Sequence, residues 1–187
     1  TTAGPSRSLL PAPKLYGGGM DELADFRQRC IDFLDAQPAP QGQPTFEQSC
    51  AFHAAAAAKG VGVGTAIPTE YGGAGLTAAH DKVWREVKNA YPVMETDFVI
   101  SHGMCLPMMN DHGTHEQKLA YMPDMIAGRT LWCQMFSEPG AGSDVASLQT
   151  KAEIDGDEWI VNGQKVWTTL AHKSQYGLLV ARNDPDQ

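Results

Sequence analysis

The sequence lacks the features that mark membrane and disulfide-rich proteins. No apolar run approaches the roughly 18 residues of a membrane-spanning helix, and the N-terminal stretch has no apolar core of signal-peptide length. The four cysteines show no CxxC spacing, so neither a zinc site nor a disulfide framework is indicated. A reducing compartment fits this cysteine usage. We therefore expect a cytoplasmic protein without a membrane span.

Positive charge is also scarce. Lys and Arg number 14 against 22 Asp and Glu, which gives a formal net charge of −8. Proteins that bind nucleic acid normally present a clustered basic face, so no nucleic-acid partner is expected. An anionic small molecule remains compatible with this balance, because a few backbone N–H groups and one cation suffice to bind it locally.

Motifs for hydrolysis, phosphate transfer and metal binding are missing as well. The sequence contains no GxSxG motif, and no P-loop lysine follows the glycines of 140–144. His112 and His115 have HxxH spacing, but no third ligand is suggested nearby. Thr114 with Gln117 instead matches a helix-capping box. No metal site is expected.

The sequence does contain a change of hydrophobic period near residue 129. Before it, apolar residues recur at three- and four-residue spacing, and capping residues and prolines mark the boundaries of helices. Helices are expected to begin at Asp21, Thr45, Thr77, Glu95, Thr114 and Pro123. The fourth is expected to end around Pro107 and the fifth at Tyr121, before Pro123 starts another helix.

After Arg129 the period becomes two, which is typical of strands. Asp155-Gly156 predicts a hairpin, and Asn162-Gly163 predicts a second tight turn into a further strand. Strands are expected near 131–136, 148–154, 158–161, 165–169 and 176–182. They indicate an antiparallel meander without obvious closure.

These patterns together predict an α+β fold, with helices followed by strands. The expected parts are an irregular N-terminal arm over 1–20, an all-helical domain over 21–128 and an incomplete antiparallel β domain over 129–187. Because the sheet looks unfinished, we expect the chain to be a fragment.

Two segments of the β part combine aromatic and hydroxyl side chains. One is Phe136-Ser137 with the Gly142-Ser143 loop, and the other is 167–169, about 30 residues further on. Trp supplies flat area, and Ser or Thr donors can address the ring atoms of a flat heterocycle. Such hydrogen bonds are how a protein tunes a redox cofactor. The alternative that Trp167 only packs on a sheet stays open on this reasoning.

Four motifs resemble the acyl-CoA dehydrogenase family. Pro68–Leu76, and Gly113–Lys118 with Met122-Pro123, resemble its N-terminal helical domain. Phe136–Asp144 resembles its first signature, and Asn162–Thr169 resembles its Gly-x-Lys-x-Trp-Ile-Thr segment. The motifs keep their order over about 70–187. The resemblance implies a helical domain, a small β domain and a C-terminal four-helix domain, with FAD between the last two.

The resemblance also implies a reaction. Members of this family of fatty acid and lipid metabolism remove hydrogens from an acyl-CoA thioester, passing the β-hydride to flavin N5 after a carboxylate takes the α-proton. An electron-transferring flavoprotein is the implied acceptor, and a homo-oligomer, a dimer or a homotetramer, is implied. The family's catalytic Glu would lie beyond Gln187, so no catalytic residue is expected here and the fragment alone is expected to be inactive.

The family's site positions can be carried over onto this sequence. The implied FAD contacts are Gln134, Phe136, Ser137, Gly142, Ser143, Trp167 and Thr169. Ser143 is also implied near the CoA chain, and Met104 in the wall of the acyl pocket. Gln134 stands where an aromatic residue is common in the family. Acyl-CoA oxidases, nitroalkane oxidases and flavin monooxygenases of the same fold remain alternatives, as does a non-catalytic acyl-CoA-binding partner subunit.

Overall fold

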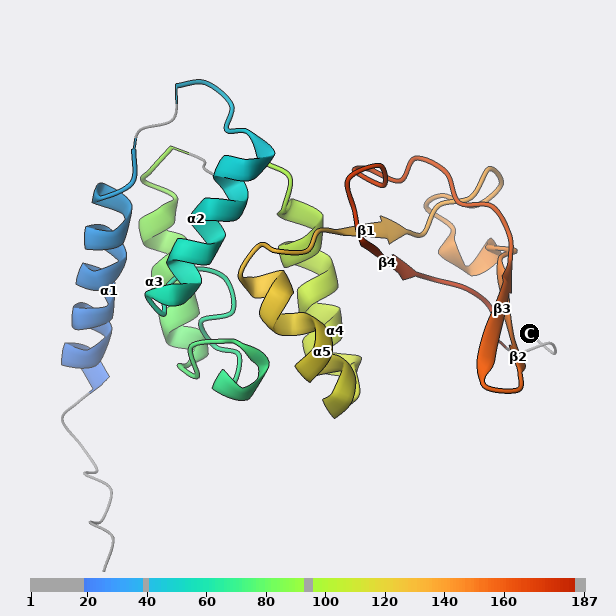
Figure 1. Cartoon of the computed structure of the whole chain (residues 1–187), viewed down its shortest axis with the longest axis horizontal. Coiled ribbons are helices and arrows are strands. Elements are labelled where there is room, and N and C mark those ends of the chain that lie inside the picture. The colour runs from blue at the N-terminus through green and yellow to red at the C-terminus, as the bar shows by residue number, and fades with distance from the viewer. Residues whose placement is uncertain (1–18, 39–40, 93–95, 184–187) are drawn as a thin grey trace, which may run out of the picture.

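The structure, a computed structural model, describes residues 19–38, 41–92 and 96–183 (Figure 1). Its α-helices come before its strands, which confirms the α+β class. The α-helices of this part are α1 Gly19–Asp35, α2 Phe46–Ala58, α3 Ala78–Lys88, α4 Leu106–His112 and α5 His115–Ile126. None of the helices in the described residues is long and apolar enough to cross a membrane. The arm expected over 1–20 lies outside these residues up to 18, and α1 already includes 19 and 20.

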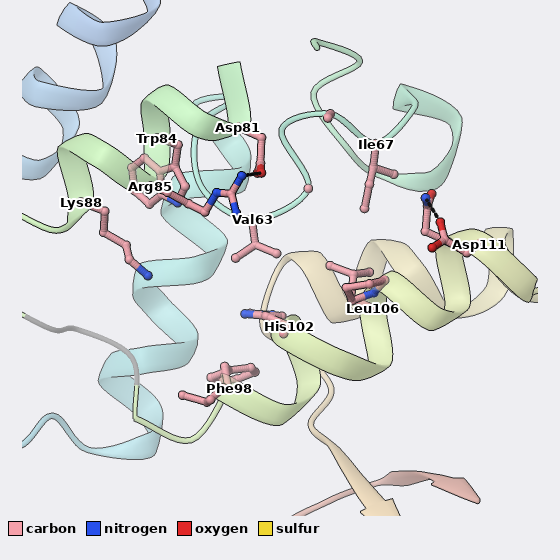
Figure 2. A pocket seen from close by; sticks show the side chains of 16 residues that line it. Val63, Ile67, Asp81, Trp84, Arg85, Lys88, Phe98, His102, Leu106 and Asp111 are labelled. Atoms are coloured by element: carbon pink, nitrogen blue, oxygen red, sulfur yellow. Dashed lines mark hydrogen bonds and ion pairs between the residues drawn. The ribbon is translucent and has the colours of Figure 1, made fainter. Parts of the chain in front are cut away.

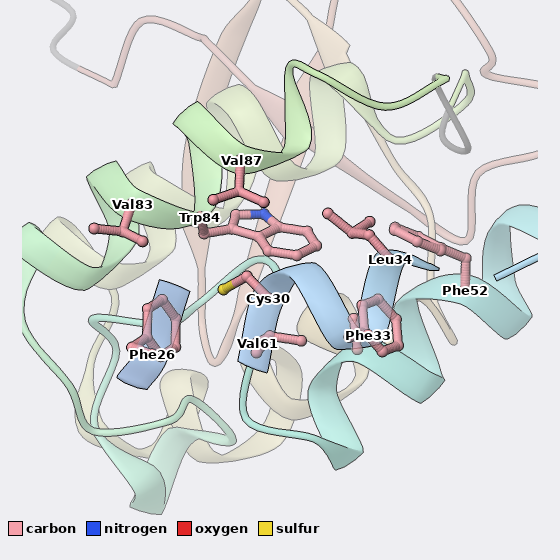
Figure 3. Packing of buried hydrophobic residues seen from close by; sticks show 10 residues of the cluster. Phe26, Cys30, Phe33, Leu34, Phe52, Val61, Val83, Trp84 and Val87 are labelled. Carbon is pink, nitrogen blue, oxygen red and sulfur yellow. The ribbon is translucent and has the colours of Figure 1, made fainter. Parts of the chain in front are cut away.

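A hydrophobic core joins α1, α2 and α3 (Figure 3). Helix α1 contributes apolar residues at three- and four-residue spacing, as the sequence predicted, and its Phe33 ring lies 6.2 Å from the Trp84 ring of α3 between centroids. The buried residues of this core are Phe26, Cys30, Phe33, Leu34, Phe52, Ala56, Val61, Val83, Trp84 and Val87. Their burial fixes the helices that support the rest of the chain.

The expected capping boxes of α2 and α5 are confirmed. At α2, the Gln48 N–H donates to Thr45 Oγ1 at 3.3 Å, and the Thr45 N–H donates to the Gln48 side chain at 2.8 Å. Thr114 and Gln117 make the same reciprocal pair at α5. Each box satisfies two backbone N–H groups that a helix start otherwise leaves unpaired.

The prediction that a helix ends around Pro107 is wrong. Helical structure continues from Val99 to His112, and the turn Ser101–Cys105 is a π-helical one in which the Leu106 N–H donates to the Ser101 carbonyl. Pro107 has no N–H to donate to the preceding turn, and the wider turn just before it accommodates that loss. The expected start at residue 95 lies outside the described residues.

The prediction of two helices meeting at Tyr121 is also wrong. Helix α5 runs through Pro123 without interruption to Ile126, and Gly128, whose φ of 66° is left-handed, follows its C-cap. Pro123 instead marks a contact with the 68–73 loop, since a Cβ on Gly72 would lie 2.7 Å from Pro123 Cα. A proline can occupy a helix when the single lost hydrogen bond is offset by packing.

The β part forms two small sheets instead of one antiparallel meander. β1, Trp132–Met135, pairs in parallel with β4, Tyr176–Leu179, whereas β2, Lys151–Asp155, pairs antiparallel with β3, Glu158–Asn162. The predicted hairpin is therefore confirmed. The predicted strand over 165–169 is wrong: that segment is irregular, with Trp167 at φ 54°.

The parallel pairing is fixed where β1 and β4 begin. The Gln175 N–H donates to the Leu131 carbonyl at 3.0 Å, and the Gln175 side chain accepts the Leu131 N–H at 2.8 Å. These two bonds align the strands in the same direction, with Trp132 opposite Tyr176. The chain between them, 136–175, leaves the helical part and returns to it (Figure 1).

Candidate functional site

The structure brings the two predicted flavin-facing segments together. β1 leads directly into Phe136 and Ser137, and the Val166 N–H donates to the Ser137 carbonyl at 2.9 Å. The irregular segment 163–169 therefore lies against the loop that follows β1. This contact joins Ser137 to Val166, the residue directly before Trp167, although about 30 residues separate Ser137 from Trp167 in the sequence.

A buried ion pair lies beneath this contact. Lys165 Nζ is 2.8 Å from Glu138 Oε1 and 2.9 Å from the Phe136 carbonyl oxygen. The exposed fractions of the two side chains are 9% for Lys165 and 6% for Glu138. Glu138 also accepts the N–H of Gln149 at 2.6 Å and of Thr150 at 2.9 Å. One carboxylate therefore connects three parts of the β region.

These hydrogen bonds decide the charge of Glu138. The bond from the Lys165 ammonium, followed by those from Thr150 and Gln149, lowers the pKa of Glu138 to about 2. Hydrogen bonds to the charged form favour it over the protonated form. Glu138 is therefore ionised at neutral pH and too weak a base to remove a proton from carbon.

The aromatic and hydroxyl residues of the site face outward. Trp167 is 79% exposed, although its backbone has a φ of 54°, which is uncommon for a bulky residue. Thr169 is exposed and Ser137 is half-buried. The Ser137 hydroxyl takes part in none of the hydrogen bonds found among the described residues. The side chains expected to hold a flavin are thus available to a ligand.

The glycine loop after Glu138 begins with a tight turn and then exposes its backbone on the surface. The Glu138 and Ala141 backbones exchange two hydrogen bonds, at 2.8 and 3.1 Å, which closes the turn. Gly142 and Ser143 follow on the surface, and a Cβ built on Gly142 would meet no atom within 4 Å. The backbone here is accessible to an anionic group.

Gly163 has a different role from the one its sequence suggested. Asn162-Gly163 predicted a tight turn into a further strand, but no strand directly follows it over 163–169. A Cβ on Gly163 would lie 2.2 Å from Thr150 Oγ1, so only glycine fits this close approach. Gly163 thereby lets the segment that carries Lys165 lie against the chain near Glu138.

Two predicted contacts lie nearer the helical part. Gln134 is half-buried on β1, opposite Leu178 of β4. Met104 is 39% exposed on the π-helical turn, next to Cys105, whose Sγ lies 3.7 Å from the Cys133 carbonyl of β1. The structure therefore places the turn that carries Met104 beside β1 and leaves the Met104 side chain accessible.

A cavity of about 610 Å³ lies between α3, the 63–67 segment and the stretch 98–111, which includes α4 (Figure 2). Trp84, Phe98 and Leu106 contribute to its wall, whereas Met104 does not. Met104, the predicted acyl contact, is therefore not part of the lining of this cavity, although its neighbour Gly103 is. Within the described ranges, no group of three His, Cys, Asp or Glu side chains could hold a metal ion.

Sequence reasoning missed Glu138 and Lys165. Each lies inside a motif that was identified, but 27 residues apart, and isolated charges usually indicate solvated positions. The available signal was that apolar residues stand close to each charge, Phe136 and Pro139 around Glu138, and Val166 and Trp167 directly after Lys165.

Comparisons with known proteins agree with this architecture. The model of the acyl-CoA dehydrogenase N-terminal domain matches residues 20–129, and that of the middle domain matches 133–187. "Acyl-CoA dehydrogenase IpdE1" of Mycobacterium tuberculosis is 42% identical over 120 residues, which are 63% of this chain and 30% of that protein. Mitochondrial isovaleryl-CoA dehydrogenase of Pongo abelii is 31% identical over 185 residues, 96% of this chain and 44% of that protein.

A solved structure gives the same result. The ChsE4–ChsE5 complex from Mycobacterium tuberculosis has a TM-score of 0.62 and 28% identity, over 94% of this chain and 45% of that one. The chain spans less than half the length of these relatives. The two family matches together cover nearly the whole described region, and the chain belongs to the acyl-CoA dehydrogenase family.

Proposed function

We propose that this chain forms the N-terminal and middle part of an FAD-dependent enzyme that dehydrogenates an acyl-CoA thioester between Cα and Cβ. The observation that carries the proposal is Trp167. A bulky residue at φ 54° with a 79% exposed side chain costs free energy and gains little internal packing. Such a residue is expected where a ligand covers it.

The described residues fit the flavin on which this family depends. Trp167 would cover the isoalloxazine, and the Thr169 and Ser137 hydroxyls would donate to its polar edge, with the Phe136 backbone beside them. The exposed backbone of Gly142 and Ser143 would approach the pyrophosphate. FAD, when bound, supplies a ring that accepts a hydride.

The substrate would meet the chain at two further places. Met104 would line the acyl pocket, since its side chain is accessible beside β1. Ser143 would lie near the CoA chain, and Gln134 would shape the thioester end of the pocket. The proton-abstracting base would come from outside these residues, as the family implies. Glu138 would not take this role, because it is held as a carboxylate with a pKa of about 2.

An electron-transferring flavoprotein would accept the electrons, and the enzyme would be a cytoplasmic homo-oligomer of fatty acid metabolism. A second candidate is a subunit that completes its site with a different chain. The structural relative from Mycobacterium tuberculosis favours this candidate, because it is a complex of two components, ChsE4 and ChsE5.

Anaerobic mixing of the full-length, FAD-loaded protein with acyl-CoA thioesters tests the proposal. We expect the flavin absorbance to bleach and to recover when an electron-transferring flavoprotein is added. Rapid recovery with oxygen alone would indicate an oxidase. A flavoprotein that no acyl-CoA reduces until a second chain is added would indicate the partner-subunit candidate.

A further inference from the structure

Lys165 binds a backbone carbonyl in addition to its ion-pair partner. Its ammonium donates to a carboxylate oxygen of Glu138 at 2.8 Å and to the backbone carbonyl of Phe136 at 2.9 Å. The Phe136 carbonyl belongs to the loop that follows β1, whereas Lys165 belongs to the segment that ends in Trp167 and Thr169. One buried cation thus connects the two segments that face the proposed ligand.

Val166, the residue after Lys165, makes a second bond between the same two segments. The Val166 N–H donates to the Ser137 carbonyl at 2.9 Å, so the carbonyls of two consecutive loop residues are bound by two consecutive residues of the other segment. With its carbonyl bound in this way, Ser137 has a fixed backbone, while its hydroxyl takes no part in the hydrogen bonds of the described residues. The hydroxyl stays available on a fixed backbone.

Glu138 closes the other end of the loop. Its carboxylate accepts the Gln149 N–H at 2.6 Å and the Thr150 N–H at 2.9 Å. The loop from Phe136 to Thr150 is therefore held at its start by Lys165 and at its end by Glu138, and these two residues bind each other. Moving either end requires breaking a charged hydrogen bond with little access to water.

A gain in folding stability alone does not explain the buried ion pair of Lys165 and Glu138. A buried ion pair is often no more stabilising than a well-packed apolar pair of similar size, because both charges lose their hydration. What charged, buried hydrogen bonds do provide is directional geometry, and binding sites depend on such support from residues behind the contact residues.

We propose that Lys165 and Glu138 are positioning residues for the flavin: they fix Ser137 and the Trp167–Thr169 segment so that both meet the cofactor together. This inference rests on the proposed function. Neither residue needs to touch the flavin. The affinity for FAD then depends on the two hydrogen bonds that Lys165 makes.

The test compares variants of the full-length protein by titration with FAD. Lys165→Met keeps the length of the side chain and removes both hydrogen bonds, and we expect the Kd for FAD to rise by about 10-fold or more. Lys165→Arg keeps a donor for each acceptor and should stay within about threefold of the native Kd. Lys173→Met is the matched control, because Lys173 makes a more exposed ion pair with Asp97.

A double variant separates positioning from charge balance. Lys165→Met combined with Glu138→Gln leaves no uncompensated charge, so we expect its thermal stability to recover towards the native value. Its affinity for FAD should remain low, because the Phe136 carbonyl still lacks its donor. If the double variant binds FAD as the native protein does, the pair only balances charge and the proposal is overturned. This variant also keeps the test available if the single Met variant does not fold.

Amide hydrogen exchange without FAD gives an independent readout. In the double variant we expect the Val166 N–H to exchange about 10-fold faster or more, since its bond to Ser137 loses the support of Lys165. The hairpin turn near Gly156 should be unchanged. Unchanged exchange at Val166 together with unchanged FAD affinity would overturn the proposal. If the native protein itself binds no FAD, the proposed function fails, whereas the exchange result still shows whether the two segments are coupled.

Discussion

Replacing Trp167 with alanine should separate ligand binding from folding. The indole is 79% exposed, so its removal should change the free energy of unfolding of the FAD-free protein by no more than about 0.5 kcal/mol. A flavin ring that covers about 100 Å² of the indole, half of what a tryptophan can bury, would gain about 2.5 kcal/mol. Stacking adds a further 0.5 kcal/mol or so, and about 3 kcal/mol corresponds to a rise of about 100-fold in Kd.

The other tryptophans supply matched controls. Trp159 of β3 is 54% exposed, and Trp159→Ala should leave both the Kd for FAD and the stability nearly unchanged. Trp84 is 3% exposed in the helical core, and Trp84→Ala should lower the free energy of unfolding by about 3–5 kcal/mol. FAD titration and chemical denaturation measure these quantities. Equal FAD affinity in the Trp167 and Trp159 variants would refute the role given to Trp167.

Three further predictions concern the same framework. The pKa of Glu138 is lowered to about 2, so its contribution to stability is present above its unfolded pKa of about 4.3 and is lost as the pH falls from there towards 2. Denaturation at several pH values should show this decline, and Glu138→Gln should weaken it. Met125→Ala, in the buried face of α5, should cost about 2–5 kcal/mol, whereas Met108→Ala, 43% exposed, should cost about 0.5 kcal/mol at most. Equal costs would contradict the core assignment. Gly163→Ala, which forces a Cβ into occupied space, should weaken FAD binding more than Gly140→Ala, where the space is open; an equal loss would contradict this.

Local signals predicted most of the helical part. The capping boxes at Thr45 and Thr114 correctly located helix starts, because a cap depends on residues that are three apart. The prolines at 107 and 123 were misread as boundaries. A π-helical turn in one case and packing against Gly72 in the other allow the helix to continue, and neither compensation can be read from a short window of sequence.

The β part depended on contacts between distant residues. The hairpin at Gly156 was predictable, since its turn is local. The parallel pairing of Trp132 with Tyr176 was not, because 44 residues separate the two strands. In the same way, the surface residues of the site could be predicted, because they lie in recognisable motifs. The ion pair of Glu138 and Lys165 behind them could not, because it forms only when the chain folds.

The most direct test of the account is flavin binding by the full-length protein. The protein should be produced with FAD present during folding, freed of unbound cofactor by gel filtration, and examined by absorbance spectroscopy. We predict flavin bands that comigrate with the native protein and are lost or weakened in Trp167→Ala. A folded native protein without flavin bands would contradict the central claim.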